Sequence, residues 1–284
     1  MTRSVGIIGH PVAHSLSPIF QGAAFRAHGL DISYERWDTP GELLAARIAS
    51  LRDPSCLGAN VTIPHKEAVF PYLDELGGQS SRAGAVNTIV NREGRLFGFN
   101  TDGPGFIAAL KNEANFDAAG RRFLLLGAGG AARGIAFALL EAGARSLAIW
   151  NRTADRAAAL ALALESAATG DQSVSVTAAA DPSTVDCVIN CTSVGMHGGG
   201  AESATPCDPG LAPARSLFVD IVYAPERTPF LAAAEATGHR TLGGLPMLVY
   251  QGALAFDLWT GIPAPIDVMF EAARSALAER ERRA

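Results

Sequence analysis

The segment that most constrains this fold is a glycine-rich turn in the middle of the chain. The apolar run at 122–126 predicts a buried strand, and Gly127-Ala128-Gly129-Gly130-Ala131-Ala132 follows it directly. This order matches the G-x-G-x-x-G/A pattern that opens a dinucleotide-binding βαβ unit, with an alanine in the third small position. The first glycine permits a tight turn, and the second lets a pyrophosphate approach the backbone where a helix begins. A glycine turn without a ligand is the alternative. The predicted cofactor contacts in the turn are Gly127, Ala128, Gly129, Gly130 and Ala131.

Length and composition narrow the class of protein. A chain of 284 residues, 48% hydrophobic and 18% charged, has enough apolar side chains for one large domain or two smaller ones. The net charge of −5 offers no basic surface for nucleic acid. No apolar run reaches the ~18 residues of a membrane span. We therefore expect a cytoplasmic protein that binds a small molecule, and neither nucleic acid nor a membrane. The cysteines form no CxxC pair, so no metal site is expected.

Apolar runs alternate with helical patterns along most of the chain. Strands are predicted at 4–9, 32–37, 58–62, 122–126, 147–150, 186–189 and 217–222, and a hairpin at 85–90 and 95–99. Helices are predicted at 17–28, 41–51, 64–76, from the glycine turn to 142, at 245–260 and at 266–280. This alternation predicts an α/β fold, and the βαβ succession after residue 122 predicts a doubly wound, Rossmann-like sheet.

The end of the second strand of that unit decides between two dinucleotides. An NAD site usually places Asp or Glu there, on the ribose 2′-hydroxyl. Here Asn151-Arg152-Thr153 follows the strand, and Arg156 lies one helical turn beyond Arg152. Two guanidinium groups and a hydroxyl favour a 2′-phosphate, because a charge-assisted hydrogen bond contributes roughly 1.5–3 kcal/mol. The alternative is a solvated arginine pair on an ordinary helix. The sequence thus predicts NADP, bound here by Asn151, Arg152, Thr153 and Arg156.

Polar residues in the first third lie where strands end and helices begin. Ser15 and Ser17 precede a helix, where alternate hydroxyls can bind a carboxylate, although N-capping by Ser17 is the plainer explanation of that spacing. Lys66 follows the strand at 58–62, and a solvated surface lysine is again the plainer explanation. Asp102 either caps the next helix or pairs with Lys66. A lysine–aspartate pair suits the proton transfer that accompanies a hydride transfer.

These clusters and several others together resemble one family, the shikimate dehydrogenases. The matching motifs run in order along nearly the whole chain: 9–18 (GHPVAHSLSP), 59–67 (ANVTIPHKE), 84–88 (GAVNT), 100–103 (NTDG), 127–131 (GAGGA), 151–153 (NRT), 190–196 (NCTSVGM), 220–223 (DIVY) and 247–252 (MLVYQG). So many ordered matches outweigh the plainer explanations of Ser15, Ser17 and Lys66.

The resemblance implies an NADP-dependent dehydrogenase that interconverts shikimate and 3-dehydroshikimate by hydride transfer. It implies Lys66 and Asp102 as the catalytic pair, with the immediate proton acceptor left open between them. It also implies that Ser15 and Ser17 hold the substrate carboxylate. A quinate or aminoshikimate dehydrogenase of the same family is one alternative. A non-catalytic NADP-binding regulator is another, and a Rossmann oxidoreductase acting on a folate or a tRNA-linked aldehyde is a third.

The resemblance extends to the other contacts and to the domains. The remaining residues expected at the substrate are Thr62, Asn87, Tyr223 and Gln251. Those expected near the nicotinamide are Thr192, Ser193 and Met196. Because the family returns its C-terminal helices to the substrate domain, we expect a substrate-binding α/β domain of 1–103 and 244–284. A Rossmann NADP-binding domain of 104–243 and a cleft between the two are also expected, in a monomer or a homodimer.

One departure from the family pattern follows the paired serines. The common pattern has His-Asn there, whereas this chain has Gln21-Gly22. Because these positions lie inside the predicted helix at 17–28, we expect altered packing or a subunit contact rather than lost chemistry.

Overall fold

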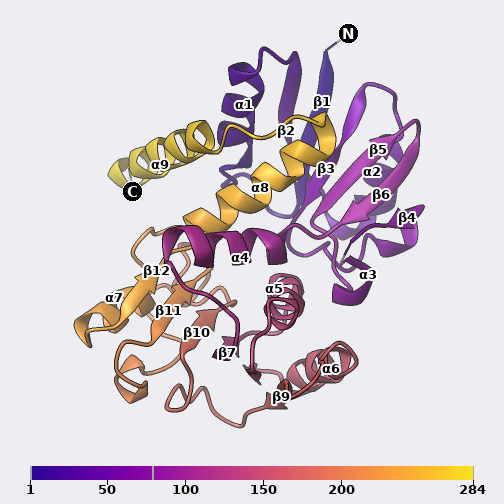
Figure 1. Cartoon of the computed structure of the whole chain (residues 1–284). Helices are drawn as coiled ribbons and strands as arrows, with labels where there is room; N and C mark the ends of the chain where they lie inside the picture. The colour runs from indigo at the N-terminus through magenta and orange to yellow at the C-terminus, as the bar shows by residue number, and fades with distance from the viewer. Residues whose placement is uncertain (1, 79, 284) are drawn as a thin grey trace. The chain divides into compact units, whose positions relative to one another are not determined.

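The computed structural model describes residues 2–78 and 80–283, the last of these by its backbone alone. The chain divides into two compact units (Figure 1). Unit 1 comprises Met1–Gly105 and Val249–Ala284, and unit 2 comprises Phe106–Leu248. The borders fall inside two helices, α4 (Asp102–Glu113) and α8 (Leu245–Thr260). The substrate-binding and NADP-binding roles that the sequence predicts for two domains, with borders after 103 and before 244, remain predictions.

Unit 1 is built on a six-stranded sheet with the order β2-β1-β3-β5-β6-β4. Its strands are β1 (Arg3–Gly9), β2 (Ile32–Asp38), β3 (Cys56–Val61), β4 (Glu75–Leu76), β5 (Thr88–Arg92) and β6 (Arg95–Phe99). β1, β2 and β3 are parallel, while β5 is antiparallel to β3 and β6. Parallel neighbours end at the same edge of the sheet, so the turns after β1 and β3 lie together. His10 N accordingly donates to Ile63 O over 3.0 Å.

Unit 1 also contains helices. They are α1 (Ser17–Ala27), α2 (Leu44–Ser50), α3 (Ser80–Ala83), α9 (Ile266–Arg283) and the unit 1 part of α8, with short 3₁₀ turns at Gly41–Leu43 and Phe70–Tyr72. α1 packs against α9, far away in the sequence. One core cluster joins Ile48 of α2 and Leu51, which directly follows this helix, to Ile8, Val61 and Ile89 of the sheet. Burying such side chains contributes roughly 1.5–3 kcal/mol each.

The helix expected at 64–76 is wrong. The chain there forms turns, the 3₁₀ turn Phe70–Tyr72 and the short β4. The physical reason is Pro71, which has no N–H to donate and whose ring clashes with the preceding helical turn. Lys66 therefore lies in a tight turn after β3 rather than on a helix.

The expected hairpin is confirmed as β5–β6. Its turn residues Glu93 (φ 54°) and Gly94 (φ 84°) both have positive φ, as the two-residue turn that matches strand twist requires. Gly94 N donates to Asn91 Oδ1 over 2.8 Å, which fixes the turn. The hairpin carries Thr88 at its start and leads into Asn100 and Asp102 at its end.

Unit 2 contains the doubly wound parallel sheet that the sequence predicted, and its strand order is β12-β11-β10-β7-β8-β9. Its strands are β7 (Arg122–Leu126), β8 (Ser146–Trp150), β9 (Ser173–Val176), β10 (Cys187–Asn190), β11 (Leu217–Asp220) and β12 (Arg240–Leu242). The strand order reverses at β7, whose neighbours are β8 and β10. In such sheets ligands bind beyond the strand ends at this switch point.

Unit 2 contains the larger part of α4 and the first residues of α8, together with α5 (Gly130–Glu141), α6 (Ala154–Glu165) and α7 (Pro229–Ala236). α5 is apolar on most of its surface, and Ile135, Leu139 and Leu140 are buried. Phe218 of β11 and Phe230 of α7 pack edge to face, with ring centroids 5.4 Å apart. Among the described residues, no helix combines the length and hydrophobicity that crossing a membrane requires.

Candidate active site

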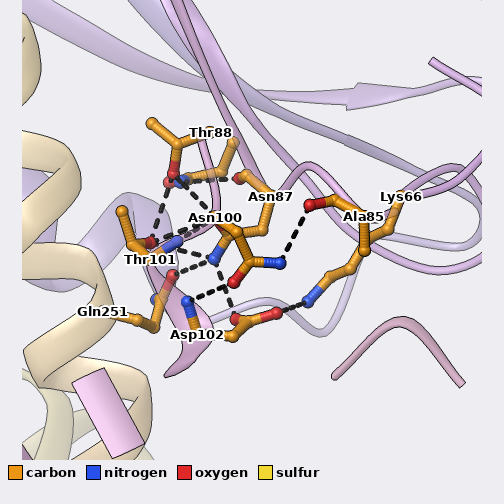
Figure 2. A network of polar contacts seen from close by, with 9 residues as sticks. Lys66, Ala85, Asn87, Thr88, Asn100, Thr101, Asp102 and Gln251 are labelled. Carbon is orange, nitrogen blue, oxygen red and sulfur yellow. Dashed lines mark hydrogen bonds and ion pairs between the residues drawn. The ribbon is translucent and has the colours of Figure 1, made fainter. Parts of the chain in front are cut away.

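The two predicted catalytic side chains meet in unit 1 (Figure 2). Lys66 Nζ lies 2.5 Å from Asp102 Oδ2. Both side chains are largely buried, with exposures of 14% and 6%. Asp102 is the first residue of α4, where the positive end of the helix dipole stabilises a carboxylate. Asp102 is thus the ionic partner of Lys66 and not merely a cap.

Asn87, just before β5, connects this ion pair to the neighbouring polar side chains. Its Nδ2 donates to Asp102 Oδ1 over 2.8 Å, to Thr101 Oγ1 over 2.9 Å and to Gln251 Oε1 over 3.2 Å. Its Oδ1 accepts from Thr101 N over 2.8 Å. The amide therefore has one fixed orientation and holds the second carboxylate oxygen of Asp102 (Figure 2).

Gln251 reaches the polar cluster formed by Lys66, Asp102, Asn87 and Thr101 because α4 and α8 approach each other closely within unit 1. A Cβ at Gly105 would lie 2.6 Å from Gln251 N, which no side chain tolerates. Glycine at this position thus brings the backbone of α8 against α4. As a result, the side chain of Gln251 meets that of Asn87, from which it is separated by 164 positions in the sequence.

A second layer of amides and hydroxyls supports the cluster. Asn100 Nδ2 donates to Ala85 O over 2.9 Å, and its Oδ1 accepts from Asp102 N over 3.1 Å. Thr88 Oγ1 donates to Asn87 Oδ1 over 3.1 Å (Figure 2). Fully partnered buried networks are rigid, because leaving one member unpaired costs about 1–3 kcal/mol.

The paired serines lie at the start of α1. Leu16 occupies the N-cap position and Ser17 is the first helical residue, so N-capping by Ser17 is wrong. Ser15 Oγ accepts from Ser17 N over 3.2 Å, and both serines are buried. Arg36 Nη2 donates to Ser15 O over 3.0 Å, and Arg280 Nη1 donates to His14 O over 2.5 Å. Two cations therefore hold this loop, which favours an anion nearby.

A phenol and an amide connect the serines with the ion-pair cluster. Tyr34 Oη donates to Asn60 Oδ1 over 2.7 Å, and Asn60 Nδ2 donates to Thr88 Oγ1 over 3.2 Å. Burial raises the pKa of Tyr34 well above its usual range, an effect that a hydrogen bond with Ser17 partly offsets. The phenol is therefore a permanent donor at neutral pH.

His65 fixes the turn that carries Lys66. The histidine is buried, and its Nε2 lies 2.6 Å from Thr39 O. Lys66 O accepts from Val86 N over 2.8 Å, and Thr62 N donates to Ile8 O over the same distance. The half-buried Thr62 thus precedes Lys66 in a turn held by β1 and by the segment before β5.

The glycine turn of unit 2 has the room and the donors that a pyrophosphate needs. Gly127 has φ 115°, and a Cβ there would lie 3.0 Å from Cys191 O. A Cβ at Gly129 would meet nothing within 4 Å, so the backbone there borders open space. No side chain caps α5, which leaves the dipole end available to an anion. Gly130 and Ala131 form its first turn. These features fit a dinucleotide.

The predicted 2′-phosphate contacts lie together beyond β8. Thr153 is the N-cap residue of α6, and Asn151 Nδ2 donates to Thr153 O over 2.8 Å. Arg152 and Arg156 are both exposed. No carboxylate stands at the strand end itself, although Asp155 follows in the first turn of α6.

The predicted nicotinamide loop follows β10, next to the glycine turn. Thr192 Oγ1 donates to Asn190 Oδ1 over 2.6 Å and accepts from Val194 N over 3.1 Å. Ser193 is exposed, and Met196 has an exposure of 37%. Tyr223, after β11, is half-buried. Because β7, β10 and β11 are adjacent, these residues share one edge of the sheet with the glycine turn.

None of the four cysteines, which all lie among the described residues, forms a disulfide. Burial raises the pKa of Cys187 well above its usual value and that of Cys207 to about 12, so neither is a thiolate at neutral pH. Within 2–78 and 80–283, no group of three or more His, Cys, Asp or Glu residues is placed to hold a metal ion.

The sequence matches models of a known protein family. Three family models match it: a shikimate dehydrogenase substrate binding domain at residues 7–89, a shikimate / quinate 5-dehydrogenase at 109–225, and a shikimate 5′-dehydrogenase C-terminal domain at 244–274. The chain belongs to the shikimate dehydrogenase family.

Individual relatives agree with this assignment. The NADP(+)-dependent shikimate dehydrogenase of Moorella thermoacetica is 47% identical, over 97% of this chain and 94% of its own. That of Symbiobacterium thermophilum is 46% identical, over 97% and 95%. The crystal structure of shikimate 5-dehydrogenase from Thermus thermophilus with NADP(H) and shikimate has a TM-score of 0.87 at 44% identity, over 97% of this chain and 100% of that chain. Membership in the shikimate dehydrogenase family confirms the resemblance seen in the sequence.

The departure from the pattern of the shikimate dehydrogenase family is explained by packing within unit 1. Gln21 is completely buried, and its Nε2 donates to Gly252 O over 2.8 Å. A Cβ at Gly252 would lie 2.5 Å from Phe20 Cε2, so α1 and α8 touch there. Gln21 thus fixes the backbone next to Gln251.

Several polar residues of the cluster were missed by reasoning from the sequence. Asn60 and Thr101 lie inside shikimate dehydrogenase motifs, which was an available signal. Tyr34 lies on β2 in a segment without any motif, and only the fold brings it to Asn60. Asp220 opened a recognised motif but received no role.

Proposed function

We propose that this protein is an NADP-dependent oxidoreductase that interconverts shikimate and 3-dehydroshikimate. The observation that carries the proposal is the buried Lys66–Asp102 pair, 2.5 Å apart and bounded by the amides of Asn87 and Gln251. The names of the relatives supply the substrate class, since those quoted are NADP-dependent shikimate dehydrogenases.

The proton of the reacting alcohol is assigned to the Lys66–Asp102 pair. Oxidation of a secondary alcohol removes a hydride from carbon and a proton from oxygen. The nicotinamide supplies the acceptor for the hydride when it is bound. Asn87 holds one oxygen of Asp102, so the other faces Lys66 Nζ. A fixed pair of this kind keeps the proton acceptor aligned with the reacting hydroxyl.

The remaining polar groups of unit 1 bind and orient the substrate. Ser15 and Ser17 hold its carboxylate in a loop bound by two arginines. Amide and hydroxyl groups bind its ring hydroxyls, and the residues assigned to this role are Thr62, Asn87 and Gln251. Tyr223 of unit 2 is assigned to the same ligand.

The cofactor is assigned to unit 2. The backbone from Gly127 to Ala131 holds the pyrophosphate at the start of α5. The 2′-phosphate lies against Asn151, Arg152, Thr153 and Arg156. The neighbours of the nicotinamide are Thr192, Ser193 and Met196. We place the enzyme in the cytoplasm, as a monomer or a homodimer.

The test mixes purified protein with shikimate or quinate and with NADP or NAD, and follows the absorbance of the reduced nicotinamide. Fast reduction with shikimate and NADP alone is the expected result. Faster turnover of quinate would move the protein to the quinate branch of the family. Binding of NADP without turnover of either acid would indicate a regulator instead.

A further inference from the structure

A buried carboxylate in unit 2 has no part in the proposed function. Asp220 ends β11 and is completely buried. Three neutral donors bind it: Asn190 Nδ2 and Val222 N reach Oδ1 over 3.0 and 2.9 Å, and Thr228 Oγ1 reaches Oδ2 over 2.7 Å. Burying a carboxylate is costly unless hydrogen bonds compensate, so a specific role is expected of it.

One of these bonds leads directly into the nicotinamide loop. Asn190 donates to Asp220, and its own Oδ1 accepts from Thr192 N over 3.0 Å and from Thr192 Oγ1 over 2.6 Å. Asn190 Nδ2 also donates to Val194 O over 3.1 Å. Asp220 therefore fixes the orientation of the side-chain amide that binds both Thr192 and Val194.

The second bond to Oδ1 leads into the segment that carries Tyr223. Val222 N donates to the same oxygen that holds Asn190. In addition, Ile221 N donates to Asn190 O over 3.1 Å. Asp220 Oδ1 thus binds both of the segments that follow the neighbouring strands β10 and β11.

The bond to Oδ2 serves a different element. Thr228 is the N-cap residue of α7, and its hydroxyl accepts from Leu231 N while it donates to Asp220. The two carboxylate oxygens therefore bind different parts of the unit. Oδ1 accepts hydrogen bonds from two segments of the proposed cofactor site, and Oδ2 accepts one from the N-cap residue of α7.

We infer that Asp220 is a positioning residue for hydride transfer, which sets the nicotinamide loop through Asn190 and the Tyr223 segment through Val222. It does not touch the substrate or the cofactor. This inference rests on the proposed function, because that function assigns Thr192 and Tyr223 to the ligands. Asp220 acts on the nicotinamide end alone, since the 2′-phosphate residues lie beyond β8, on the other side of β7.

The test compares two ligands of different reach on the full-length chain. NADP spans the whole cofactor site, whereas 2′,5′-ADP carries only the adenosine and the 2′-phosphate. For Asp220→Ala we expect kcat/KM with NADP to fall by about 10- to 100-fold, from the loss of hydrogen bonds to a charged group. The dissociation constant of 2′,5′-ADP, measured by calorimetry, should change by less than about twofold.

Two variants separate positioning from folding. Asp220→Asn keeps an acceptor oxygen for Asn190 and Val222, so it should restore most of the lost kcat/KM. Thr228→Val removes the bond to Oδ2 and the cap of α7 but leaves Oδ1 occupied. It should lower the melting temperature and leave KM for NADP unchanged. If Asp220→Ala does not fold, Asn190→Ala, which cuts the same path, should show the same loss with NADP and the same retention of 2′,5′-ADP.

The inference is overturned if Asp220→Ala has wild-type kinetics, or if NADP and 2′,5′-ADP weaken together. It is also overturned if Thr228→Val reproduces the kinetic loss, because Asp220 would then act only through the helix. Failure of the proposed function is distinguishable: wild-type protein would bind NADP without oxidising shikimate, and calorimetry with NADP and 2′,5′-ADP would still decide the role of Asp220.

Discussion

The two units build their candidate sites by opposite means. Unit 1 uses side chains from distant segments that bond to one another, and its ion pair depends on Asn87 and Gln251. The proposed pyrophosphate site of unit 2 uses the backbone of one contiguous turn, with open space at Gly129 and no side-chain cap on α5. A site made of side chains orients reacting groups, whereas a site made of backbone amides accepts any ligand with phosphates in the right place.

The largest expected effect tests the side-chain site. Lys66→Ala should lower kcat by about 10²- to 10⁴-fold, the usual contribution of a positioned acid–base group, with little change in KM for shikimate. Steady-state kinetics checks this. Lys111→Ala, on the exposed end of α4, is the matched control and should behave as wild type. Near-normal turnover of the Lys66 variant would remove the pair from the mechanism.

A pair of glycine substitutions contrasts the units directly. Gly105→Ala places a Cβ 2.6 Å from Gln251 N, so overpacking should lower the free energy of unfolding by about 1–3 kcal/mol. Gly129→Ala meets nothing within 4 Å and should leave stability unchanged or raise it by about 0.4–1 kcal/mol, while KM for NADP rises. Urea denaturation and kinetics measure both. Equal destabilisation would contradict the contrast.

Charge gives a third contrast, because Asp102 has a cationic partner and Asp220 has three neutral ones. Burial raises the pKa of Asp220 from 3.8 to about 6, although its hydrogen bonds lower it in part. The folded pKa exceeds the unfolded one, so this stabilising contribution is complete below pH 3.8 and is lost as pH rises through about 6.

Relative to Asp220→Asn, the wild type should therefore lose about 2 kcal/mol of unfolding free energy between about pH 4 and about pH 7. Urea denaturation of both proteins at the two pH values gives the difference. A difference that does not vary with pH would show that the carboxyl titrates alike in both states.

The smallest effect tests cofactor choice. Arg152→Ala should raise KM for NADP about tenfold and leave KM for NAD unchanged, because an exposed guanidinium contributes at the low end for charge-assisted bonds. Arg145→Ala, directly before β8 and at its other end, is the control. An equal change for both dinucleotides would mean that Arg152 does not contact a 2′-phosphate.

The same contrast explains what could be predicted from the sequence. The strand Arg122–Leu126, the glycine turn and α8 at Leu245–Thr260 were placed correctly, because their signals are local. The site of unit 1 could be predicted only from the resemblance to a family. Spacing alone favoured a solvated surface lysine at Lys66 and simple N-capping by Ser17. Tyr34 was missed because nothing in its own segment indicates that β2 brings it to Asn60.

The errors have local physical causes too. Pro64 suggested the first turn of a helix at 64–76, but Pro71 interrupts the helical pattern within that range. Spacing alone favoured Ser17 as the N-cap residue of α1, but Leu16 occupies that position and Ser17 N donates to Ser15 Oγ. Apolar patterns report burial, and they do not report how polar backbone groups find partners.

The division of unit 1 into Met1–Gly105 and Val249–Ala284 has a consequence for biosynthesis. Every residue of unit 2 leaves the ribosome before the last part of unit 1 does. Unit 2 can therefore fold during translation. Unit 1 cannot complete its fold until α8 and α9 have been synthesised, although its first segment, which carries most of its motif residues, is made much earlier. Because Gln251 and α9, the helix that packs on α1, follow unit 2 in the sequence, unit 1 is completed only after all of unit 2 has been made. A nascent chain stalled before residue 249 would therefore contain all of unit 2 and only the first segment of unit 1.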